Sequence, residues 1–176
     1  MRRLDIDGWL GLVVDGQRLL VRSATAAVVL RTLVAYPQAA LVELDAYARG
    51  GSVTGDPPRV EERDGGWFSY GDYVPGQTLL REVEVGFGTM TVDPVLAPAL
   101  RPWRAGPLRW HLADVRPGRG TSDGTIDTAR YLLYPYPPTA DLRIAVAWRS
   151  RDIAPSVVPL ELPAPDVVAA RTTTIW

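Results

Sequence analysis

The sequence contains no cysteine and a single histidine in 176 residues. Without cysteine there can be no disulfide, no thiolate nucleophile, no cysteine-bound zinc and no iron–sulfur cluster. One histidine also excludes sites that need two imidazoles, although sites made of Asp and Glu remain open. We therefore expect no bound cofactor and no metal site. Lysine and asparagine are missing too, so arginine is the chain's only strongly basic residue.

Long apolar runs are also missing. No stretch approaches the roughly 18 apolar residues that a helix needs to cross a bilayer. The apolar run near the N-terminus is broken by Asp5, Asp7 and Gly8, unlike the core of a signal peptide. These features predict a cytoplasmic protein that does not enter the membrane.

The net charge of −1 and the pI of about 5.8 argue against a general electrostatic attraction to nucleic acid or to anionic membranes. The charge is unevenly distributed, with −6 over residues 40–95 and +3 over residues 96–176. The two segments could face one another within the fold or between subunits, or they could be unrelated solvated surfaces. Solvated surfaces are the simpler interpretation.

Sixteen glycines and sixteen prolines punctuate short apolar runs rich in β-branched residues, which is the pattern of many short strands. Asp15 and Gly16 favour a tight hairpin turn between strands at residues 9–14 and 18–22. Alternation predicts a half-buried strand from Ala40, with Val42, Leu44 and Ala46 on the core face and Glu43, Asp45 and Tyr47 facing water. Further strands are predicted at residues 26–35, around 80–85, and at 86–92, 108–115, 129–134, 142–148 and 157–162.

Near the C-terminus, Asp166 is suited to cap a short helix over residues 167–173. The glycines Gly86 and Gly88 indicate a bulge or close backbone packing. Together these elements predict an all-β fold. We expect one antiparallel β-sandwich over residues 1–176, jelly-roll-like, with a short C-terminal helix.

Two segments resemble a known group of proteins. Residues 131–176 contain Pro137 and Pro138, Trp148, Ile153 and Trp176, and residues 30–49 contain a strand pair around a Tyr-Pro turn. In these features the chain resembles a group of small actinobacterial all-β proteins to which no function is assigned. The resemblance implies an all-β fold and no particular activity.

Catalytic interpretations find little support. His111 lies three residues before Asp114 and would be a candidate general base, but the sequence offers no nucleophile motif to accompany it. Glu82 and Glu84 would share one face of a strand, as an acid pair of a glycosidase requires, yet they are better explained as the wet face of that strand. We predict no catalytic residue.

Two groups of residues are candidates for binding. Trp103, Arg104, Arg109, Trp110 and His111 mix aromatic and basic side chains, which can stack on bases, contact an acidic protein surface or simply be structural.

A second group, Trp67, Tyr70 and Tyr73, adjoins an acidic loop. It could stack on sugars, anchor a protein interface or belong to the core. The leading hypothesis is a non-enzymatic interaction or assembly module that associates with itself or with a protein partner. The alternatives are a carbohydrate- or small-ligand-binding sandwich and, less favoured, a hydrolase based on Asp and Glu.

Overall fold

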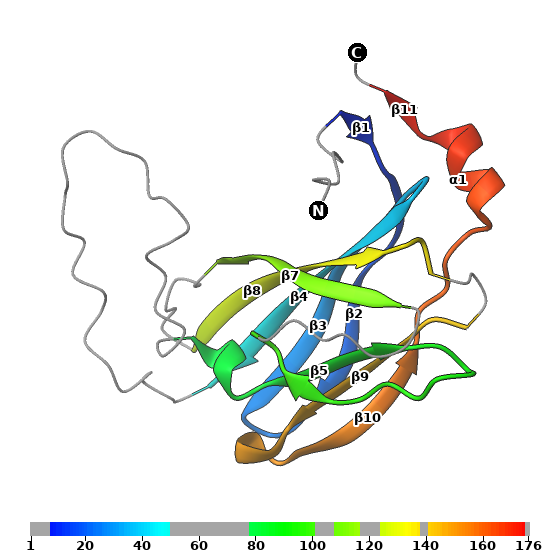
Figure 1. The fold of residues 1–176 in the computed structure, drawn as a ribbon. Coiled ribbons are helices and arrows are strands. Elements are labelled where there is room, and N and C mark those ends of the chain that lie inside the picture. Colours follow the sequence, from blue (N-terminus) through cyan, green and yellow to red (C-terminus); the bar gives the residue numbers. More distant parts are fainter. Residues whose placement is uncertain (1–7, 50–77, 101–107, 117–123, 138–140, 175–176) are drawn as a thin grey trace, which may run out of the picture.

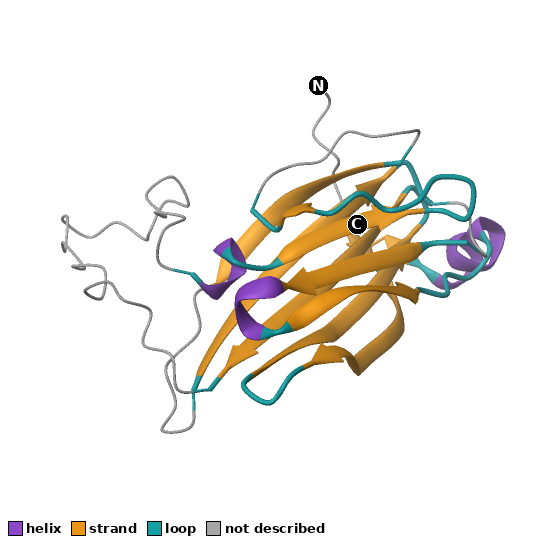
Figure 2. Ribbon diagram, turned by 90° about the horizontal axis from the view of Figure 1, so that it is seen from below, coloured by secondary structure: helices purple, strands orange, loops and turns teal. Residues whose placement is uncertain are grey.

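A computed structural model describes residues 8–49, 78–100, 108–116, 124–137 and 141–174. Within these ranges the chain forms antiparallel sheets and one short α-helix, so the all-β prediction is confirmed. Figure 2 shows that the strand axes of the two main sheets are roughly aligned with one another.

The larger sheet has five strands in the order β2-β3-β4-β8-β7. Strands β2 to β4 form a meander, whereas β8 inserts between β4 and β7 although it follows both of them in the sequence. Pro37 and Gln38 form the turn between β3 and β4, as the Tyr-Pro pattern suggested. The strands are β2 (Leu12–Arg22), β3 (Ala26–Tyr36), β4 (Ala39–Ala48), β7 (Arg109–Arg116) and β8 (Thr125–Tyr134).

The smaller sheet has four strands in the order β10-β9-β5-β6. Its strands are β5 (Glu84–Gly88), β6 (Ala97–Pro98), β9 (Arg143–Trp148) and β10 (Ile153–Pro159). Short 3-10 helices precede β5 at Leu79–Arg81 (η3) and join β9 to β10 at Arg149–Arg151 (η4).

The two ends of the described chain meet in a small ribbon. Strand β1 (Trp9–Leu10) pairs with β11 (Thr173–Thr174), which follows helix α1 (Pro165–Arg171). This ribbon and α1 lie beside one end of the two sheets (Figure 1). The predicted cap is wrong, because Pro165 occupies the first helical turn, the N-cap is Ala164, and Asp166 lies inside the helix.

Several predicted strand limits shift. The strand expected around Leu80 begins only at Glu84, because Leu79–Arg81 forms η3 and Thr78 caps it. The strand expected at 86–92 ends at Gly88, and the one expected at 157–162 is found at Ile153–Pro159.

The predicted hairpin at Asp15 and Gly16 is wrong. Strand β2 runs without interruption through both residues and pairs with β3 along its whole length. The register shifts between Val13 and Asp15, and Gln17 has a φ of 53°. The positive φ falls on Gln17, the residue after the Asp15–Gly16 pair, and it marks an irregularity within the strand, not a reversal of the chain.

The core lies between the inner faces of the two sheets. Val42, Leu44 and Ala46 of β4 are fully buried there, as predicted. Phe87 of the smaller sheet contacts Trp110 of the larger one, with ring centroids 5.4 Å apart. This contact joins the two layers.

The outer face of the smaller sheet is covered by its own chain. A Cβ at Gly86 would lie 2.3 Å from the carbonyl oxygen of Val95, and one at Gly88 would lie 2.5 Å from that of Val92. The backbone that follows β5 therefore crosses closely over these two glycines. This is the close backbone packing that the sequence predicts for them. The neighbouring Ala145 and Ala147 of β9 are consequently buried.

Candidate functional site

Of the residues proposed for binding from the sequence, the structure describes Arg109, Trp110 and His111, all in β7. Trp67, Tyr70, Tyr73, Trp103 and Arg104 lie outside the described residues. Arg109 begins β7 and is exposed, and His111 is paired in register with Leu132 of β8.

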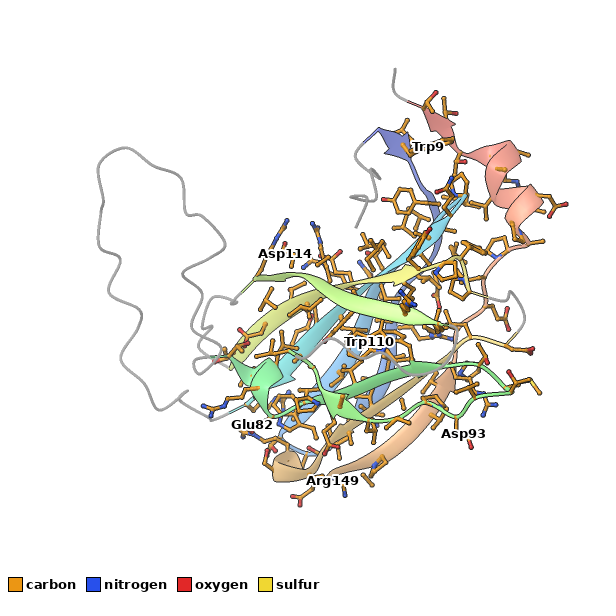
Figure 3. All side chains as sticks on the ribbon, in the orientation of Figure 1. Trp9, Glu82, Asp93, Trp110, Asp114 and Arg149 are labelled. Carbon is orange, nitrogen blue, oxygen red and sulfur yellow. The ribbon has the colours of Figure 1, made fainter. Side chains whose placement is uncertain are left out.

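Trp110 belongs to the core rather than to a binding surface. Its side chain is 2% exposed and makes edge-on contacts with Phe87 and Tyr131, the latter with ring centroids 5.4 Å apart. Tyr131 donates a hydrogen bond from its hydroxyl to the carbonyl of Ala99, 3.0 Å away, and burial raises its pKa. The prediction failed for Trp110 because alternation along β7 turns its side chain inward, between the sheets (Figure 3).

Some described residues of the acidic middle and of the basic end pair with one another within the fold. Arg130 pairs with Glu43 at 3.2 Å and Arg149 pairs with Glu84 at 2.8 Å. The preference for unrelated solvated surfaces is therefore wrong for these groups, because strand pairing places distant segments side by side. The charge asymmetry along the sequence is in part neutralised locally.

The outer face of the five-stranded sheet contains the densest of these contacts. Asp45 accepts a hydrogen bond from Thr128 at 2.6 Å and lies 3.5 Å from Arg31. Tyr47 donates to Asp45 at 3.3 Å, and burial together with this carboxylate raises the pKa of Tyr47. The predicted wet face is thus polar but largely covered, with Glu43 9% and Asp45 6% exposed.

Glu43 and Asp114 are two carboxylates that contact the same arginine. Arg130 contacts both, at 3.2 Å from Glu43 and 4.0 Å from Asp114, and Arg116 binds Asp114 at 3.0 Å. Each carboxylate is therefore engaged by a guanidinium on a neighbouring or the same strand. This is the geometry of a cross-strand ion network, which orients and neutralises its members.

A second polar cluster lies at one end of the smaller sheet, where Figure 3 labels Glu82 and Arg149. Glu82 accepts hydrogen bonds from the Ser150 hydroxyl at 2.6 Å and from the Trp148 indole at 3.2 Å. The Ser150 hydrogen bond lowers the pKa of Glu82 most, and Trp148 and Arg151 lower it further against the effect of burial. Glu82 precedes β5, so it does not form the same-strand pair with Glu84 that the sequence suggested.

Replacing Ser150 with alanine is expected to raise the pKa of Glu82 toward its ordinary value. A carboxylate with a lowered pKa stabilises the fold above the ordinary glutamate value of about 4.3 and loses that contribution as the pH falls through the lowered pKa. The stability difference between wild type and Ser150→Ala should therefore be present at neutral pH and vanish in acid. A carboxyl-detected NMR titration of Glu82 measures the shift directly.

Ser156→Ala is the matched control for this prediction. It removes a hydroxyl that donates to the carbonyl of Ala154 and has no contact with Glu82. An unchanged Glu82 titration in Ser150→Ala would show that the hydroxyl does not set this pKa.

Exposed apolar side chains gather on the first strands. Trp9, Leu10, Val13 and Leu19 are 36%, 62%, 67% and 48% exposed, and we call these four residues the N-terminal apolar edge. The remaining large exposed apolar side chains in the described part of the chain are scattered over other elements: Met90, Val95, Tyr134, Val157 and Val167.

Between the two strands that carry the N-terminal apolar edge, the chain packs against β3. A Cβ at Gly11 would lie 2.4 Å from Cγ1 of Val34 and 2.7 Å from Cε1 of Tyr36, so only glycine lets the chain lie this close to them. Val13 is also paired in register with Val34. The edge is therefore continuous with apolar side chains of β3, and Trp9 marks its upper end in Figure 3.

The geometry defines an antiparallel all-β protein with two sheets packed around one core. Searches with protein-family models, among curated proteins and among solved structures find no match to this chain. No helix in the described ranges is long and apolar enough to cross a membrane. Those same ranges hold no group of three or more His, Cys, Asp or Glu side chains placed to bind a metal.

Proposed function

We propose that this chain is a non-enzymatic protein-interaction module that docks through the N-terminal apolar edge. The observation that supports this most directly is the exposure of Leu10 and Val13, at 62% and 67%, within one short stretch beside Trp9. Contiguous exposed apolar surface is a common mark of a protein–protein contact, and tryptophan is among the residues that most often anchor one.

The other edges of the two main sheets are less suited to docking. Pro155 and Pro159 interrupt the hydrogen-bonding potential of edge strand β10, and β6 is only two residues long. Edge strand β7 presents an ion pair between Asp114 and Arg116. Strand β2 is the edge that combines length with exposed apolar side chains.

The polar clusters support a role other than catalysis. The carboxylates of Glu43, Asp114 and Glu84 are paired with arginines, and that of Glu82 accepts two hydrogen bonds from side chains of the fold. Their contacts hold strands and turns together. Such residues contribute to a rigid scaffold for a docking edge.

Photo-crosslinking in the native cell tests the proposal. A photoreactive amino acid at Val13 should give a specific covalent protein adduct. The same amino acid at Val157, a similarly exposed valine on the other sheet, should give none. Absence of any adduct at Val13, or equal labelling from both positions, would count decisively against docking through this edge.

A further inference from the structure

Resting on this proposed function, we propose that the partner is a second copy of this chain. In the proposed dimer, β2 pairs antiparallel with β2 of the other copy about a twofold axis at Gly16. The five-stranded sheets would then continue into one another, with the N-terminal apolar edges on either side of the axis. An interface of this kind is isologous, so every contact occurs twice.

The residues of β2 are arranged almost symmetrically around Gly16. Val13 and Leu19 lie three residues to either side of it, and Leu12 and Leu20 lie four residues to either side. An antiparallel pair centred on Gly16 places Val13 of one copy opposite Leu19 of the other. The same register places Leu12 opposite Leu20.

The faces of these residues agree with that register. Val13 and Leu19 are paired in register with Val34 and Val29 of β3, which alternate with the buried residues Leu33 and Leu30. Both therefore project from the outer face. Leu12 and Leu20 instead pack partly against the core. Each cross-copy pair thus joins residues of the same face, as antiparallel pairing requires.

The near-symmetric spacing of apolar residues about Gly16 favours a second copy over an unrelated partner. Asp15 and Arg18 lie on opposite sides of Gly16 and pair within the chain at 3.2 Å, with side chains 30% and 38% exposed. In the antiparallel register, Asp15 of one copy lies opposite Gln17 of the other and Arg18 lies opposite Val14, so this ion pair remains within each copy. A net charge of −1 leaves little repulsion between copies.

The centre of the pair is shaped by the irregular part of β2. Gly16 has no side chain to obstruct the axis, and its N–H is bonded to the Asp15 carboxylate at 2.7 Å. Gln17, with a φ of 53°, bends the strand beside the axis. The residues on either side of the axis would supply the main-chain pairing, and the register of β2 with β3 shifts once on each side, between Val13 and Asp15 and between Leu19 and Val21.

The absence of native cysteine permits a direct test of the register. Val13→Cys and Leu19→Cys proteins are purified separately, then mixed under mild oxidation. Because opposite residues of an antiparallel pair have Cα atoms about 5 Å apart, the mixture should form a covalent dimer. Each variant alone should form far less, since its two thiols would lie roughly 20 Å apart. A mixture of Val13→Cys with Val157→Cys is the matched control.

Sedimentation equilibrium of the cysteine-free protein measures association without crosslinking. We expect a concentration-dependent dimer whose dissociation constant rises at least about tenfold in Val13→Arg and is unchanged in Val157→Arg. A wild type that stays monomeric, or a cysteine mixture that crosslinks no better than its components, would overturn the second-copy inference. If Val13 nevertheless captured a different protein in cells, the proposed function would stand without this inference.

Discussion

Replacing Trp110 with alanine is expected to lower the free energy of unfolding by about 4 kcal/mol, in the middle of the range for deleting a buried aromatic side chain. The indole is 2% exposed and contacts Phe87 of the other sheet as well as Tyr131 of the next strand. Its loss would leave a cavity at the contact that joins the layers. Urea unfolding followed by circular dichroism measures the change independently of tryptophan fluorescence.

Arg109→Ala is the control for this substitution. Arg109 is the neighbouring residue on the same strand and is exposed, so its replacement should change stability by no more than about 0.5 kcal/mol. Equal stabilities for the two variants would contradict the placement of Trp110 in the core.

Replacing Asp127 with alanine is expected to cost about 3 kcal/mol, because hydrogen bonds to a charged group contribute about 1.5–3 kcal/mol each. Asp127 of β8 is 2% exposed, and its carboxylate accepts hydrogen bonds from the Thr78 hydroxyl and from the Leu79 backbone N–H, the latter at 2.5 Å. It thereby fixes the start of η3 against the larger sheet. Thermal and urea unfolding both report the loss.

Two further variants separate the contributions to this contact. Asp127→Asn keeps an acceptor oxygen and should lose less stability than Asp127→Ala. Thr78→Ala combined with Asp127→Ala should cost less than the sum of the two single changes, because both remove the same hydrogen bond. Strict additivity would show that the Thr78 hydrogen bond contributes nothing measurable.

The strands predicted best are those whose information is local. The β-branched content of residues 26–35 predicts a strand, and β3 spans Ala26–Tyr36. The alternation of residues 142–148 likewise matches β9 (Arg143–Trp148). In both cases the residue types that favour a strand are present in the segment itself, so the prediction needs no knowledge of the partner strand.

The errors arise where the outcome depends on a partner. Asp15 and Gly16 suit a tight turn and a strand irregularity equally, and only pairing with β3 distinguishes the two. The charges of Glu43 and Arg130 looked unrelated because they are far apart in sequence, yet β4 and β8 are paired in register at these residues. Local propensity holds no information about such long-range registers.

The candidate site shows the same limit. The aromatic and basic residues chosen from the sequence included Trp110, whose environment is decided by the sheet opposite it. The sequence does not predict that Val13 and Leu19 are exposed, because apolar residues in a predicted strand are ordinarily expected in a core. Their exposure follows from the position of β2 at a sheet edge with both side chains on the outer face, which only the strand order reveals.

The insertion of β8 between β4 and β7 has a consequence for biosynthesis. As the ribosome extends the chain, β4 can pair with β3 at once, but its other edge has no native partner until Thr125–Tyr134 has emerged. At ordinary translation rates that interval is on the order of 10 s. During this interval β4, which lies in the middle of the finished sheet, presents an unpaired edge. The nascent chain is therefore most vulnerable to aggregation or chaperone capture before β8 emerges.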